Sequence, residues 1–168
     1  MEANKGIKYL GRDNRESNLN PSWILSGLHT DEKSIAWAQG FAYHLAVTDE
    51  TSDLLRDTRG KEFLRANLST SQLRKFFGEI KRIQAQEFDP SGKWLAEVRM
   101  LKPKLAYAVG REKNKDPKIY DFYRELEIGI NAITKQEHFQ TFVQLLEAIV
   151  AYHKFFEKSV KLEQNEQN

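Results

Sequence analysis

The sequence contains no cysteine, and this absence excludes disulfide bridges and zinc sites built on thiolates. No apolar run approaches the ~20 residues that a membrane-spanning helix needs. The first twenty residues, MEANKGIKYLGRDNRESNLN, lack the apolar segment of a secretory signal. We therefore expect a soluble cytoplasmic protein that does not associate with a membrane.

Motifs of catalysis and metal binding are missing too. The sequence has no H-E-x-x-H pair, no G-x-S-x-G turn and no glycine-rich phosphate loop, since AVGREK has a single glycine. His153 lies at helical spacing from Ile149 and Phe156, so it is expected to be structural, whereas His138 is expected to be exposed beside a helix cap. The remaining histidines are His29 and His44. We predict a protein that is not an enzyme and needs no metal or cofactor.

What the chain does have is enough apolar material for one domain and an uneven charge. It has 168 residues, 40% of them hydrophobic, and no internal repeat. The net charge is only +2, but residues 56–118 carry 16 Lys and Arg against 8 Asp and Glu, and both flanking segments are acidic. A basic middle between acidic ends favours a local patch for a polyanion over a merely solvated surface.

Apolar residues recur at helical spacing over five segments, and no strand-like alternation is visible. The sequence thus predicts an all-α fold, a compact bundle of about five principal helices within residues 31–160. Residues 48–67 offer at most a short helix, residues 1–30 are expected to form a flexible N-terminal extension, and residues 161–168 a frayed tail. The predicted helices cover approximately residues 31–47, 68–87, 93–111, 119–133 and 134–158.

Two capping boxes predict where helices begin. STSQ at 69–72 and TKQE at 134–137 both place Gln or Glu three residues after Ser or Thr. The helix after the second box, with HFQTFVQLLEAIVAYHKFF, is apolar over more than half of its circumference. Such a helix is either central in its bundle, which we favour, or partly a contact between protomers.

The helix at 68–87 has an apolar face and an opposite basic face. On a helical wheel the apolar side is formed by Leu73, Phe76, Phe77, Ile80 and Ile83, and the basic side by Arg74, Lys75, Lys81 and Arg82. Gly78 lies on the basic side at a cost of about 1 kcal/mol relative to Ala. Either another backbone approaches closely there, as a phosphodiester chain would, or a neighbouring helix packs against it.

The next helix continues the basic surface around Pro103, which either kinks this helix or begins a second piece of it. Lys104, Tyr107 and Arg111 share one edge if the proline preserves the helical register, and Lys102 lies on the other side of the proline. Arg111 near a helix end is also explained by the helix dipole. Such side chains contact phosphate and recognise shape, not bases.

Three stretches, LSTSQLRKFF, LKPKLAYAVGREK and FVQLLEAIVAYHKF, resemble in this order the small subunit of the type III-A CRISPR Csm interference complex. The resemblance covers about residues 68–158. The small subunit of the related Cmr complex is similar in size and role.

The resemblance implies a helical bundle without an active site. Several copies would line a ribonucleoprotein filament beside its backbone and large subunits, and would hold CRISPR RNA and target RNA along their backbones. It implies that five residues face RNA: Arg74, Lys75, Lys102, Lys104 and Arg111. The helical wheel adds Lys81 and Arg82 to this set.

Two other functions remain open from the residues alone. One is a helical scaffold whose basic patch binds an acidic protein partner. The other, less favoured, is a helical nuclease whose active site is assembled from carboxylates that are distant in sequence.

Overall fold

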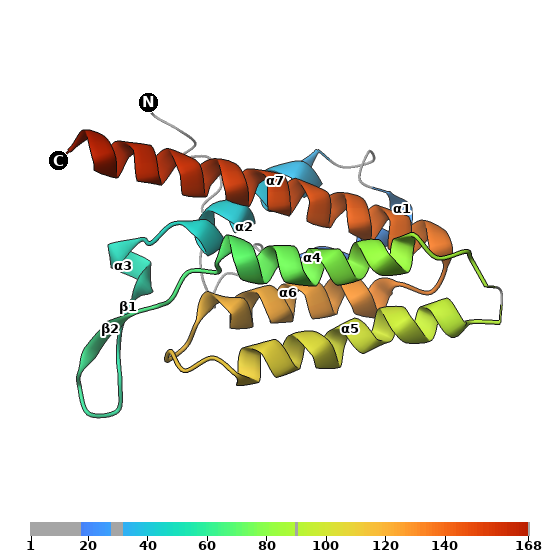
Figure 1. Cartoon of the computed structure of the whole chain (residues 1–168), viewed down its shortest axis with the longest axis horizontal. Helices are drawn as coiled ribbons and strands as arrows, with labels where there is room; N and C mark the ends of the chain where they lie inside the picture. The colour runs from blue at the N-terminus through green and yellow to red at the C-terminus, as the bar shows by residue number, and fades with distance from the viewer. Residues whose placement is uncertain (1–17, 28–31, 90, 168) are drawn as a thin grey trace.

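The computed structural model describes residues 18–27, 32–89 and 91–167, and Figure 1 shows its arrangement. Five long helices form the bundle: α2 (Lys33–Ala46), α4 (Thr70–Gln84), α5 (Lys93–Gly110), α6 (Lys118–Ala132) and α7 (Gln136–Glu166). Two short helices and one small hairpin accompany them: α1 (Pro21–Ser26), α3 (Glu50–Asp53), β1 (Leu54–Arg56) and β2 (Glu62–Leu64). The predicted helical bundle is confirmed.

Helix α7 is the central helix of the bundle. It contacts α1, α2, α4 and α6, and Figure 1 shows it running the full length of the molecule. Its buried side chains include Phe142, Leu146 and Ile149, as expected for a core helix, whereas Phe155 is exposed. The helix continues to Glu166, beyond residue 158 where the sequence predicted its end.

The segment before α2 contributes to the core. Leu19, Trp23 and Ile24 are buried, and the backbone N–H of Leu19 donates a hydrogen bond of 2.7 Å to Glu125 Oε2 on α6. The bundle therefore includes residues 18–27, which revises the expectation that it begins at residue 31. The rest of the expected N-terminal extension, with His29, lies outside the described residues.

One of the two predicted capping boxes is present. Ser69 Oγ accepts from the Gln72 backbone N–H, and Gln72 Oε1 accepts from the Ser69 N–H, both at 3.1 Å. The second is wrong, because α7 begins after Lys135 with no side-chain cap. There the backbone N–H of Thr134 donates to Nδ1 of His138 at 3.2 Å instead. His138 is consequently buried, not exposed as predicted.

The hairpin within residues 54–64 was not predicted. Each strand has three residues, which is too short for an alternating pattern to stand out. The turn between them is stabilised by Asp57 Oδ1, which accepts from the backbone N–H groups of Arg59 and Lys61 at 2.9 Å. Gly60 has a φ of 79°, a conformation that glycine adopts without strain. Asp57 and Gly60 are the signals that could have indicated this turn.

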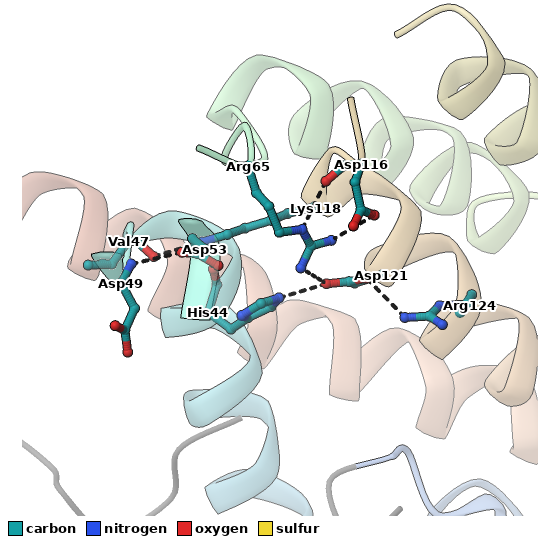
Figure 2. A network of polar contacts seen from close by, with 9 residues as sticks. All are labelled: His44, Val47, Asp49, Asp53, Arg65, Asp116, Lys118, Asp121 and Arg124. Atoms are coloured by element: carbon teal, nitrogen blue, oxygen red, sulfur yellow. Dashed lines mark hydrogen bonds and ion pairs between the residues drawn. The ribbon is translucent and has the colours of Figure 1, made fainter. Parts of the chain in front are cut away.

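A fully buried lysine connects this region to the bundle. Lys118 Nζ donates to the carbonyl oxygens of His44 and Val47 at 2.7 and 2.8 Å and lies 2.7 Å from Asp53 Oδ2 (Figure 2). Its three N–H groups thus meet three acceptors at the C-terminal end of α2 and at α3. Burial lowers the pKa of Lys118, and the hydrogen bond and charge of Asp53 oppose this.

Asp121 is the second centre of the network in Figure 2. Its Oδ2 accepts from Arg65 Nη1 at 2.7 Å and from His44 Nε2 at 2.8 Å, and its Oδ1 accepts from Arg124 at 3.0 Å. Burial alone would raise the pKa of Asp121, but the hydrogen bonds from His44 and Arg65 and the Arg65 charge hold it well below its usual range. Because an ionised carboxylate can only accept, His44 donates from Nε2.

These contacts determine where α4 begins. The backbone N–H of Lys118 donates to Ala66 O, and that of Leu68 donates to Leu45 O, both at 2.9 Å. Buried His153 donates from Nε2 to Leu68 O at 2.8 Å, so it is structural as predicted. The residues just before Ser69 are thereby held by α2, α6 and α7, and the orientation of α4 follows.

The two buried histidines predict a loss of stability in mild acid. Burial lowers the pKa of His44 and of His153 in the folded chain, whereas the unfolded chain protonates them near about 6.5. The unfolded state then binds more protons, so the free energy of unfolding falls as the pH decreases through about 6.5. Thermal unfolding should show a Tm that decreases from about pH 8 to about pH 5.

The control is the double variant His44→Gln/His153→Gln. Its amides keep an N–H donor near each Nε2 position but do not titrate, so its Tm should depend less on pH over this range. Equal pH dependence in the two proteins would contradict the assignment.

Candidate nucleic-acid interface

Helix α4 separates apolar from basic residues as the helical wheel predicts. Leu73, Phe76, Ile80 and Ile83 are buried, and Phe77 is half-buried against the core. The basic residues of the opposite side are all exposed: Arg74, Lys75, Lys81 and Arg82. The capped start of α4 therefore directs one face inward and leaves the cations in solvent.

Helix α5 packs against α4 as a single helix that contains Pro103. The end of α5 lies near the start of α4, because Gln72 Nε2 donates to Glu112 Oε1 at 2.6 Å. The expected edge of Lys104, Tyr107 and Arg111 is present and exposed. Along it, the Arg111 guanidinium lies 5.6 Å from the centroid of the Tyr107 ring.

A groove of about 710 Å³ runs between α4 and α5. Its lining is mostly apolar, with Phe76, Met100, Pro103, Leu105 and Tyr107 among the residues that form it. Three of the predicted RNA-facing cations also line it: Lys75, Lys104 and Arg111. The tertiary structure thus brings together cations that are up to 36 positions apart in sequence.

Four of the seven predicted cations already have acidic partners. Lys81 pairs with Glu147 at 2.9 Å, and Lys102 lies 3.9 Å from Glu127 and donates to Asn131. These two therefore turn toward α7 and α6, not toward the groove. Arg82 and Lys104 share Glu79 at 3.3 and 2.8 Å, and Arg82 also lies 3.7 Å from Glu97.

Glu79 is the main counterion beside the groove. The hydrogen bond from Lys104, with that from Arg82, lowers its pKa, so it remains a carboxylate at neutral pH. Its charge reduces the positive potential at this end of the interface. Sequence reasoning missed this role, because a wheel of one helix does not show that Lys104 of α5 reaches Glu79 of α4.

Arg74, Lys75 and Arg111 differ from the other four. All three are exposed, and none forms an ion pair with any residue in the described part of the chain. They belong to the start of α4 and to the residue after α5, which the contact between Gln72 and Glu112 holds together. Arg74, Lys75 and Arg111 together form the basic end of the candidate interface.

Gly78 lies on the exposed side of α4, and a Cβ atom placed there would meet no atom within 4 Å. The alternative in which a neighbouring helix of this chain packs against it is therefore wrong among the described residues. The other alternative stays a prediction: Gly78 is an open position between Arg74 and Arg82, where another molecule could approach closely.

Replacing Gly78 with Ala should raise the free energy of unfolding by about 1 kcal/mol, because Ala favours the helix and the new methyl group meets no obstacle. Urea denaturation measures the effect. Gly129→Ala is the matched control, since a Cβ there would lie 2.9 Å from Phe142 Cε2 and should destabilise the protein. Destabilisation by both substitutions would contradict the open position of Gly78.

No group of three or more His, Asp or Glu side chains in the described part of the chain could hold a metal ion. Among the helices that the structure describes, none is long and apolar enough to cross a membrane.

The fold and this surface define a small helical bundle with one basic, grooved face. The sequence model of a protein family, Csm2 Type III-A, matches residues 50–159, which is more than half of the chain. The matched region includes the hairpin and the helices α4 to α6. The chain therefore belongs to the Csm2 family and is a small subunit of the type III-A CRISPR complex, Csm. No curated protein and no solved structure matches it.

Proposed function

We propose that this subunit binds the sugar-phosphate backbone of RNA in the Csm complex through the α4–α5 face. The observation that supports this most directly is the basic end formed by Arg74, Lys75 and Arg111, three exposed cations without an acidic partner in the described residues. Phosphate oxygens are strong acceptors for such cations, and their contacts carry no sequence information. The RNA in question is the CRISPR RNA with its target.

The seven predicted cations then contribute unequally. A phosphate can approach Arg74, Lys75 and Arg111 without displacing an acidic side chain. Arg82 and Lys104 must first exchange Glu79 for phosphate, but exposed ion pairs are worth only about 0–1 kcal/mol, so the exchange is feasible. Lys81 and Lys102 lie further to the sides and would contribute least.

Weak binding by one copy is compatible with function in an assembly. Three to five phosphate contacts provide modest affinity, but several copies on one RNA act together, because binding by one raises the effective concentration of the next. We propose further copies of this chain, with the backbone and large subunits of the Csm complex, as its partners in the cytoplasm.

We also propose that the subunit does not catalyse RNA cleavage. The two carboxylates that line the groove are engaged, Glu79 with Lys104 and Glu112 with Gln72. Incubation of the purified chain with RNA and Mg²⁺ should leave the RNA intact on a denaturing gel. Metal-dependent cleavage that Glu79→Gln or Glu112→Gln abolishes would favour the nuclease hypothesis instead.

The triple variant Arg74→Gln/Lys75→Gln/Arg111→Gln should lose RNA affinity for all sequences alike. If each cation meets one phosphate of a single strand, the slope of log K against log salt should become shallower by about 2. The side chains are exposed, so the Tm should change little. Fluorescence anisotropy with labelled RNA at several salt concentrations measures the slope.

A matched control removes the same charge elsewhere. Lys93, Lys154 and Lys158 are exposed and lie outside the interface, so replacing all three with Gln should leave most of the slope intact. If the two triple variants behave alike, net charge alone explains binding and the proposed interface is wrong. If neither affects RNA but the first loses an acidic protein partner, the scaffold hypothesis takes its place.

A further inference from the structure

Tyr107 is exposed to a degree that packing does not explain. Its side chain is 68% exposed, the highest value among the large hydrophobic residues in the described part of the chain. Its hydroxyl forms no hydrogen bond with another described residue. An aromatic ring that contributes little to the core is available for a ligand.

The surroundings of Tyr107 combine an apolar surface with cations. Pro103 lies one turn before it along α5 and Met100, 53% exposed, lies two turns before it, and both line the same groove. Arg111 covers part of the ring, and Lys75 borders the groove from α4. Phosphate-binding groups therefore lie next to a flat apolar surface, which is the combination that binds single-stranded nucleic acids.

We propose that the groove holds an unpaired RNA nucleotide, whose base stacks on Tyr107 while Lys75 and Arg111 contact the adjoining phosphates. This inference rests on the proposed function and deepens it, because it adds a base contact to the phosphate contacts. The helical wheel places Tyr107 beside Lys104 and Arg111 but gives no indication of the groove, which needs residues from both helices.

The polar groups of the groove indicate that the base is bound without recognition of its identity. Gln72 donates to Glu112, and Glu79 accepts from Lys104, so these side chains are occupied by one another. With these side chains engaged, and with Lys75 and Arg111 assigned to the phosphates, the base is held by stacking, which every base can provide. Binding should thus tolerate any nucleotide at this position.

A base that enters the groove must not be stacked on the neighbouring bases of its own RNA. In a continuous duplex the bases stack on one another, so the face of a base is not available to Tyr107. The groove therefore selects RNA with an unpaired or displaced nucleotide over a fully paired helix, whereas the basic end binds both.

The experiment compares three probes: a single-stranded RNA, the same RNA with abasic positions, and a fully paired duplex with the same total number of nucleotides, so that the phosphate charge is matched. Tyr107→Ala in the full chain should weaken single-strand binding about 5- to 150-fold, the range for one stacked base. It should hardly change binding of the abasic strand or the duplex. Tyr107→Phe, which keeps the ring, should bind like the unchanged protein.

Tyr120→Ala is the matched control. Tyr120 is also exposed, at 40%, and carries Arg124 at 5.1 Å from its ring centroid, but it belongs to α6 and does not line the groove. It should leave the affinity for all three probes unchanged. Circular dichroism and thermal unfolding check that each variant is folded.

Two outcomes would overturn the proposal. If Tyr107→Ala binds the single strand normally while the triple variant of Arg74, Lys75 and Arg111 loses affinity, the phosphate interface stands but the groove holds no base. If Tyr107→Ala weakens the abasic strand and the duplex as much as the single strand, the ring supports Arg111 and does not stack on RNA. Failure of the triple variant itself would instead refute the proposed function.

Discussion

The arrangement of this molecule depends on two buried charges of α6, Lys118 and Asp121. Lys118 donates hydrogen bonds to carbonyl groups at the C-terminal end of α2, which have no partner within the helix because the helix ends there. Asp121 accepts a hydrogen bond from Arg65, just after the hairpin. Removing one partner from such a buried pair typically costs about 3–5 kcal/mol, because the other charge is left without compensation. The residues that connect α2 to α4 are therefore held in position by these buried contacts.

That constraint extends to the candidate interface on α4 and α5. Once the residues before Ser69 are held in place, α4 can bury its apolar stripe against α7 and α5 in only one orientation, and its cations face outward. Helix α5 then lies antiparallel beside it, which brings Arg111 to Lys75 and opens the groove between them. A buried network outside the groove thus determines which cations lie close together.

Neighbouring carboxylates also determine which cations are available to a ligand. Glu79 draws Arg82 and Lys104 together, and Glu147 and Glu127 turn Lys81 and Lys102 aside. The result is a gradient along one face, from free cations beside an exposed aromatic ring to cations that are already neutralised. Under the proposed function, such a graded surface suits RNA binding that is weak for each copy and independent of sequence.

The sequence by itself determined the helical class, the capped start of α4 and the two faces of that helix, because these depend on residues within a few turns of one another. It also carried the resemblance to the type III-A small subunit. It could not reveal the hairpin, whose strands are too short, nor the burial of His138 at the start of α7. Only the tertiary structure decided which of seven equivalent cations lack a counterion, because Glu147, Glu127 and Glu97 come from other helices. The groove at Tyr107 exists for the same physical reason: its two walls are distant in sequence and meet only when α4 and α5 pack together.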